Sequence, residues 1–183
     1  NAIGSGPRLE TPRSFALDGD HWLVADSEVN ALMAIDVASG DRSVLLDGDT
    51  SLLQNPRAIV LDNARQRAFV LDNIETAPRL LALDLQTRAL TVISGPDGAN
   101  TIGAGPALDD PETMVFDAAR NRLLVVDSDA LALFSVDPVS GDRAVISGFD
   151  PQSNTLIGAG DELDFPTALA LSRDNNSVLV ADS

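Results

Sequence analysis

The sequence predicts an all-β protein built from repeated sheets of four antiparallel strands, and three observations predict it. One phrase, which reads Pro-Arg-Ala-Ile-Val-Leu-Asp in its second copy, recurs four times along the chain. Its copies begin at Pro12, Pro56, Pro111 and Pro166. A second apolar phrase follows each copy and ends in an aspartate, namely Asp26, Asp72, Asp127 and Asp182. No stretch shows apolar residues at helical spacing, so we expect almost no helix.

The strands can be assigned in order within each complete repeat, because every repeat holds four short runs rich in Val, Ile, Leu and Phe. The first repeat predicts strands over Ser14–Asp18, Trp22–Asp26, Ala31–Val37 and Ser43–Leu46. The second predicts Ala58–Asp62, Ala68–Asp72, Leu80–Leu85 and Leu90–Ile93. The third predicts Thr113–Asp117, Leu123–Asp127, Leu131–Asp137 and Ala144–Ile146. Turn residues such as Asp18-Gly19-Asp20 and Ser140-Gly141-Asp142 separate the runs.

Four antiparallel strands in a repeat of roughly 40–50 residues are typical of one blade of a β-propeller. The nearly continuous apolar runs suit strands that are covered on both faces, as when blades stack face to face. The sequence of the repeat also resembles that of a known family. Pro166–Ser183 is similar to the blade signature shared by NHL-repeat, YWTD and gluconolactonase-like propellers of the six-bladed type.

We interpret the chain as a single, incomplete propeller domain. Residues 1–11 are the tail of a preceding blade, 12–55, 56–110 and 111–165 are complete blades, and 166–183 is half a blade. A closed propeller needs about four to eight blades. We therefore expect the natural protein to continue at both ends, or to close by pairing with another chain. Open sheet edges also predict self-association.

Composition narrows the classes of function. The chain has 183 residues and a net charge of −16, with 23 Asp, 5 Glu, 12 Arg and no Lys. Such an acidic chain would be repelled by phosphates, so nucleic acid is not an expected partner. No apolar run reaches membrane-spanning length, so membrane insertion is not expected. Cysteine is absent, which excludes disulfides and thiolate chemistry. The only histidine, His21, lies in a turn, which argues against a Ser-His-Asp triad and against a zinc site with several histidines.

Two kinds of loop should share one face of each blade: the turn between the second and third strands, and the crossover to the next blade. Both kinds are acidic here. The turns hold Asp26, Glu28, Asp72, Glu75, Asp127 and Asp129, and the long crossovers Pro96–Asp110 and Asp150–Asp164 hold seven more acids. The first crossover, Gly48–Asn55, is shorter. Each long crossover contains Ile-Gly-Ala-Gly, which suits either a functional loop or a repeated structural turn.

The strand-end aspartates recur in every repeat, which favours a structural role in accepting backbone N–H groups of the following turn. The sharper candidates are residues that differ between repeats at the same position. These follow the prolines and are Arg13, Arg57, Glu112 and Thr167. Since they begin the innermost strands, we expect them to line the mouth of a central channel as ligand-binding residues.

The family resemblance implies a specific alternative. Gluconolactonase-like enzymes hold a divalent cation such as calcium with a Glu of one blade and the Asn of a Pro-Asn-Gly phrase. Glu112 is the candidate for the first ligand, whereas Thr167-Ala168 replaces Asn-Gly. A hard cation needs several oxygen ligands. The preferred hypothesis is a non-catalytic binding module, exported or on a cell surface, with a protein or carbohydrate partner on the loop-rich face. The alternative is a gluconolactonase- or streptogramin-lyase-like hydrolase or lyase, with Glu112 and Arg57 near the channel mouth.

Overall fold

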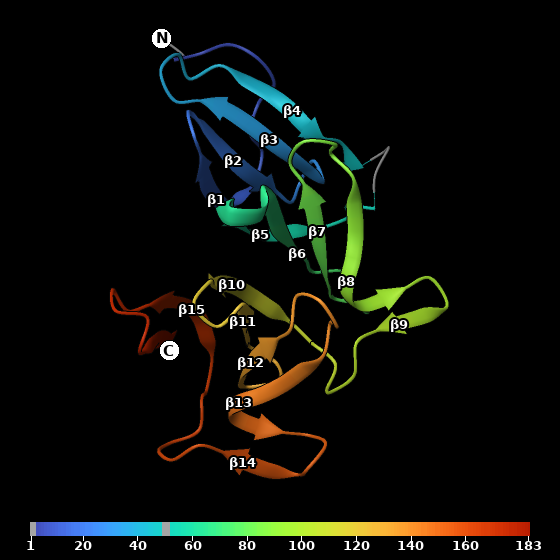
Figure 1. Ribbon diagram of the computed structural model, residues 1–183, viewed down its shortest axis with the longest axis vertical. Coiled ribbons are helices and arrows are strands. Elements are labelled where there is room, and N and C mark those ends of the chain that lie inside the picture. The colour runs from blue at the N-terminus through green and yellow to red at the C-terminus, as the bar shows by residue number, and fades with distance from the viewer. Residues whose placement is uncertain (1–2, 49–51) are drawn as a thin grey trace. The chain divides into compact units, whose positions relative to one another are not determined.

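A computed structural model describes residues 3–48 and 52–183, so part of the Gly48–Asn55 crossover lies outside the described residues. The described chain forms four antiparallel sheets and contains no α-helix (Figure 1). Each sheet contains one copy of the recurring phrase. The all-β fold with propeller-like blades is thus confirmed. A 3₁₀ turn, Asn63–Arg65, joins the first two strands of the second sheet.

The first sheet has the order β1-β2-β3-β4 and the second has the order β5-β6-β7-β8-β9. The first comprises β1 (Pro12–Asp18), β2 (His21–Asp26), β3 (Ala31–Asp36) and β4 (Arg42–Leu46). The second comprises β5 (Pro56–Asp62), β6 (Arg67–Asp72), β7 (Arg79–Asp84), β8 (Leu90–Asp97) and β9 (Asn100–Ile102). The predicted strands are all present, and most begin one or two residues earlier than the apolar runs.

The third sheet has the order β10-β11-β12-β13-β14, and the fourth contains β15 and β16. The third comprises β10 (Pro111–Asp117), β11 (Arg122–Asp127), β12 (Ala132–Val136), β13 (Arg143–Asp150) and β14 (Thr155–Ile157). The last two strands are β15 (Pro166–Leu171) and β16 (Val178–Asp182). The short strands β9 and β14 were not predicted. Each folds back on the extended end of the fourth strand, so both long crossovers begin with a β-hairpin.

The chain divides into two compact units. The first contains Asn1–Asp72 and Leu81–Thr91, and the second contains Asn73–Leu80 and Val92–Ser183. Strands β7 and β8 therefore each contribute residues to both units.

The core lies in the second strands of the repeats and the strands beside them. In β11 the four consecutive residues Leu123–Val126 are fully buried, and in β6 the same holds for Ala68–Leu71. Burial of consecutive residues means that both faces of the strand are covered, as the continuous apolar runs predict. In the second unit, Leu124 and Val126 belong to a cluster that also takes in Leu169 and Val180 from β15 and β16. The third and fourth sheets are thus packed against each other through apolar side chains.

Some apolar side chains of the first and last sheets stay exposed. Phe15 of β1 is 66% exposed and Leu179 of β16 is 62% exposed. Phe15 packs edge-on against Trp22 of β2, with ring centroids 5.1 Å apart. No helix among the described residues is long and apolar enough to cross a membrane.

Candidate functional site

The residues after the four prolines all occupy a β-bulge. In the first strand of each sheet the proline pairs with the strand-end aspartate, and the pairing then slips by one residue. The extra residues are Arg13, Arg57, Glu112 and Thr167. A bulge bends the strand and re-aims the side chain of its extra residue. The repeat in the sequence identified these four positions, but no local sequence pattern predicted that they would form a bulge.

Two of these residues contact the residue that follows the strand-end aspartate. The Nε of Arg13 donates to Ser27 Oγ at 3.1 Å, and Ser128 Oγ lies 3.5 Å from Glu112 Oε1. Arg13 and Arg57 belong to the first unit, whereas Glu112 and Thr167 belong to the second. A common channel mouth formed by all four remains a prediction.

Glu112 is the candidate metal ligand, so its surroundings decide whether a calcium site fits. Within the described part of the chain, no group of three acidic or histidine side chains is placed to hold one ion. A divalent cation at Glu112 would therefore need most of its ligands from other oxygen donors, such as backbone carbonyls, amide side chains or water.

The strand-end aspartates hold the crossovers in place. Asp26 accepts the backbone N–H of Glu10 and Thr11 at 2.8 and 2.9 Å. The same pair of bonds, from the two residues before the proline, is made by Asp72, Asp127 and Asp182. The expected bonds from the following turn are also present for Asp26 and Asp127, but the crossover provides the recurring partners. The structural role of these aspartates is therefore confirmed, with a different main partner.

Two of the Ile-Gly-x-Gly segments, residues 3–6 and 102–105, also have a structural role. Gly103 lies so close to the next repeat that a Cβ added there would be 2.0 Å from the backbone oxygen of Gly141, and Gly4 has the same relation to Gly40. Both glycines have positive φ angles, +75° and +74°. These segments pack against turns between the third and fourth strands, at the opposite end of the sheet from the loop-rich face. These two segments are therefore packing elements.

One arginine fastens each of these segments. Arg143, the first residue of β13, is buried and its Nε donates to the backbone oxygen of Pro106 at 2.7 Å. Its Nη1 donates to Ser94 Oγ at 2.7 Å and to the backbone oxygen of Ile102 at 3.1 Å. Arg42 repeats the first bond, with Nε donating to Pro7 at 2.7 Å. The guanidinium fork thus satisfies several loop carbonyls at once.

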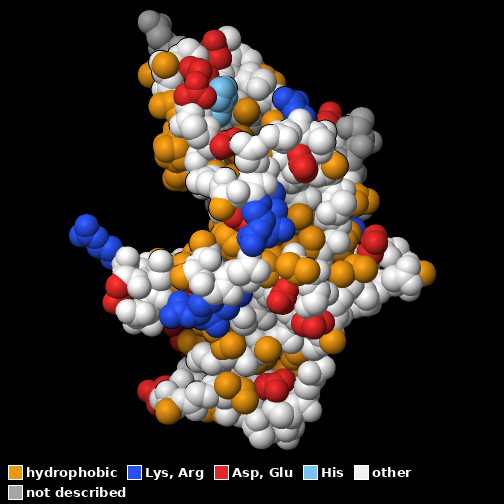
Figure 2. All heavy atoms as spheres, in the orientation of Figure 1, with side chains coloured by type: hydrophobic (Ala, Val, Ile, Leu, Met, Phe, Trp, Pro, Cys, Tyr) orange, Lys and Arg blue, Asp and Glu red, His pale blue; other side chains and the backbone are white. Residues whose placement is uncertain are grey.

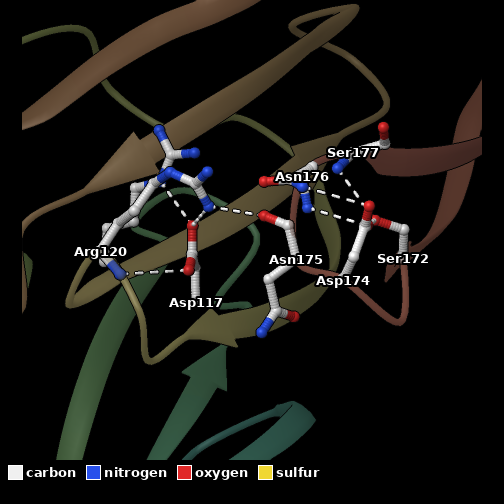
Figure 3. A network of polar contacts seen from close by, with 8 residues as sticks. Asp117, Arg120, Ser172, Asp174, Asn175, Asn176 and Ser177 are labelled. Atoms are coloured by element: carbon white, nitrogen blue, oxygen red, sulfur yellow. Dashed lines mark hydrogen bonds and ion pairs between the residues drawn. The ribbon is translucent and has the colours of Figure 1, made fainter.

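Two buried aspartates at the end of the strands opposite the loop-rich face form ion pairs that sequence reasoning missed. Asp117 accepts from Arg120 Nη1 and Arg122 Nε, each at 3.1 Å, and its side chain is fully buried. Figure 3 shows Arg120 reaching across to the next hairpin, where it donates to the backbone oxygen of Asn175 at 2.7 Å. In the same hairpin, Asp174 accepts from Ser172 at 2.7 Å. The arginine therefore ties the third sheet to the fourth.

The sequence did contain a signal for these pairs. Asp62-Asn-Ala-Arg65-Gln-Arg67 in the second repeat and Asp117-Ala-Ala-Arg120-Asn-Arg122 in the third share the spacing Asp-x-x-Arg-x-Arg. Asp62 makes the same contacts to Arg65 and Arg67 at 3.0 Å. Burial alone would raise the pKa of Asp117, but the hydrogen bonds from Arg122 and Arg120 outweigh it and hold the pKa below its usual range.

Three acidic residues of the loop-rich end line one hollow of about 540 Å³ in the second unit. Asp109 comes from the crossover into the third repeat, Asp129 from the β11–β12 turn and Glu162 from the crossover out of it. The sequence placed these acids on one face, and the structure brings them to one hollow. Its apolar lining includes Leu108, Leu131 and Phe149, which sequence reasoning did not single out. Figure 2 shows apolar side chains with acidic ones beside them over β12 to β14.

Asp127 positions two walls of this hollow. Its carboxylate accepts the N–H of Asp109 at 2.7 Å on the crossover side and the N–H of Ala130 at 3.0 Å on the turn side. Burial raises the pKa of Asp127, and the nearby Asp109 raises it further, while the backbone N–H groups oppose the rise. The single histidine, His21, is half-exposed and its Nδ1 lies 2.7 Å from Asp20 Oδ1. It does not line the hollow.

The fold is that of known propeller structures. The chain is similar to a chain in the crystal structure of a nidogen/laminin complex, with a TM-score of 0.67, 23% identity, and coverage of 95% of this chain and 60% of that one. It is also similar to an auxiliary nutrient binding protein from Bacteroides thetaiotaomicron, with a TM-score of 0.63, 13% identity, and coverage of 88% and 42%. Hydrazine synthase from Kuenenia stuttgartiensis gives a TM-score of 0.64, 13% identity, and coverage of 96% and 43%.

The four sheets and these similarities define the class: the chain is a β-propeller repeat protein. It spans between two fifths and three fifths of the length of these similar chains. The chain matches no protein-family model and no curated protein.

Proposed function

We propose that this chain belongs to an exported, non-catalytic β-propeller that binds a partner through its loop-rich face. The observation that carries the proposal is the gathering of Asp109, Asp129 and Glu162, from three separate loops, around one hollow with an apolar lining. Loops on a rigid scaffold are where binding residues concentrate, and such concave, mostly apolar sites with a few polar groups bind ligands.

A protein partner is preferred over a carbohydrate. The similarity to a chain from the crystal structure of a nidogen/laminin complex supports this choice. The acidic rim supports it as well, since polypeptides carry cationic side chains and neutral sugars do not.

The test is to probe a peptide array and a glycan array with the labelled chain, and then to map binding by hydrogen exchange. We expect saturable binding to polypeptides, with slower exchange in the β11–β12 turn and around Ala107–Asp110. Turns at the other end of the strands, such as 173–176, should not change.

The hydrolase alternative is tested in the same preparation. Lactone hydrolysis is measured with and without calcium, for the natural chain and for Glu112→Gln. Calcium-dependent hydrolysis that Glu112→Gln abolishes would contradict a non-catalytic module. Protection confined to the opposite turns would contradict the assignment of the face.

A further inference from the structure

The hollow in the second unit is better matched to one kind of partner segment than to others. Six of its nine lining residues are apolar, and the largest are Leu108, Leu131 and Phe149. Phe149 is 41% exposed, which leaves part of its ring available for contact. A volume of about 540 Å³ is within the range of ligand sites and can accept one or two side chains. Leu108, Leu131 and Phe149, which we call the floor of the hollow, therefore favour contact with an apolar side chain of a partner.

The rim of the hollow is negative on more than one side. Asp109, Asp129 and Glu162 come from three different segments, and none of the described lining residues is basic. The net charge of −16 adds to the negative potential. Charge complementarity therefore calls for a cationic partner. The described residues form no three-ligand metal group, so a cation carried on a flexible side chain fits better than a bound metal ion.

The walls are held before any partner arrives. The carboxylate of Asp127 accepts hydrogen bonds from the backbone N–H groups of both Asp109 and Ala130. The N–H of Ser128 donates to the backbone oxygen of Asp110 at 3.1 Å. A site whose walls are already fixed loses less entropy on binding.

We propose that this hollow binds a short segment of a partner protein in which an aromatic or aliphatic side chain stands beside arginine or lysine. The apolar side chain contacts Leu108, Leu131 and Phe149, and the flanking cations reach the carboxylates of the rim. This inference rests on the proposed function and specifies the chemistry of its partner.

A substitution of Leu131 can test whether the floor of the hollow contributes to binding. It has a φ of +51°, a left-handed conformation that disfavours leucine, and the corresponding residue of the first repeat, Asn30, has the same φ. Asparagine is therefore suited to this backbone position. Leu131→Asn should remove the apolar contact without straining the turn.

The probe is a blocked peptide Gly-Arg-Phe-Arg-Gly, with Gly-Arg-Gly-Arg-Gly and Gly-Gln-Phe-Gln-Gly as controls. We expect the first to bind the chain about tenfold more tightly than either control, because only it can use both the floor and the rim. Its binding should persist in part at 0.5 M salt, where exposed charges are largely screened.

Two triple variants with the same change in net charge locate the binding. Asp109→Asn/Asp129→Asn/Glu162→Gln should weaken binding about tenfold. Asp18→Asn/Glu28→Gln/Asp97→Asn removes three acids that do not line the hollow and should change binding less than twofold. Leu131→Asn should weaken binding about fivefold and leave the urea midpoint unchanged or higher. Far-ultraviolet circular dichroism checks that each variant is folded.

Several results would overturn the proposal. Equal weakening by both triple variants would show that only net charge matters, and equal binding of the Arg-Phe-Arg and Arg-Gly-Arg peptides would show that the floor is not used. If polypeptides from the array still bind and protect the loop-rich face in the Asp109→Asn/Asp129→Asn/Glu162→Gln variant, the proposed function stands and the hollow is not the site. If the chain binds no polypeptide at all, both proposals fail.

Discussion

Replacing Arg143 by methionine should destabilise the second unit far more than the matching change at Arg42 destabilises the first. Methionine keeps most of the apolar stem, so the loss comes from the guanidinium. Arg143 makes two bonds of 2.7 Å, to Pro106 and Ser94, and a third of 3.1 Å to Ile102. Hydrogen bonds to charged groups contribute about 1.5–3 kcal/mol each but are not additive, so we expect a loss of about 3–4 kcal/mol.

Arg42 provides the matched control. It makes one bond of 2.7 Å and two longer ones of 3.3 and 3.4 Å, and both the first and the second of the three are exposed. We expect about 1–1.5 kcal/mol for Arg42→Met. Urea unfolding followed by hydrogen exchange of residues 102–106 and 3–7 reports on each segment separately. A cost for Arg143→Met below about 1 kcal/mol, or equal costs for the two variants, would refute the role of the buried guanidinium.

Four further outcomes follow from the same structure. Gly103→Ala should cost more than about 3 kcal/mol in thermal or urea unfolding, because its Cβ would meet the Gly141 oxygen, whereas Gly158→Ala, in the same Ile-Gly-Ala-Gly sequence but with only Ser147 Oγ at 3.6 Å, should cost about 1 kcal/mol. Asp117→Asn should cost about 2–3 kcal/mol at pH 7; since the folded pKa is lowered, this stability is present above the unfolded pKa of about 3.9 and is lost as the pH falls through the folded value, so the difference between variant and natural chain should shrink in acid. For Asp127 the pH dependence of stability has the opposite sign, because its pKa in the folded state is raised. Its contribution to stability should decline as the pH rises from about 3.9 to the pKa of the folded state, and Asp127→Asn should abolish this slope in pH-dependent urea titrations. Self-association through open sheet edges stays a prediction that sedimentation velocity checks; Phe15→Ser, which removes a side chain 66% exposed on β1, should lower it if the face beside that edge contributes, and unchanged association would show that it does not.

Most of the fold could be predicted because its signals are local. Proline at the start and aspartate at the end of the paired strands bracket each hairpin, and the apolar runs lie between them. The register of Pro111 with Asp127 is the structural form of this pattern. Strand β12 begins at Ala132 rather than at the predicted Leu131, because Leu131 adopts the left-handed φ of the turn. Such a conformation is not expected for leucine, so it could not be predicted from the sequence.

The parts that were missed depend on contacts between distant segments. Strand β14 has only three residues, Thr155–Ile157, and exists because it can pair with the extended end of β13. The hollow likewise requires Leu108, Leu131 and Phe149 to meet from three segments. Sequence reasoning could place the acidic loops at one end of the sheet, because strand order alone determines that. It could not identify which apolar side chains would lie between them.

Two motifs far apart in the sequence form one structural unit. The first and third repeats follow an Ile-Gly-x-Gly segment and contain Ser-Gly-Asp-Arg, whose arginine binds that segment. The second repeat follows a crossover without Ile-Gly-x-Gly and has Gln86-Thr87-Arg88 instead, and Arg88 donates to the backbone oxygen of Leu45. The two motifs therefore occur together because each satisfies the other, which explains their repetition without any ligand. Positions that escape such mutual constraints are free to differ between repeats. Leu131 where the first repeat has Asn30, and Asp109 where it has Glu10, are of this kind, and both line the hollow.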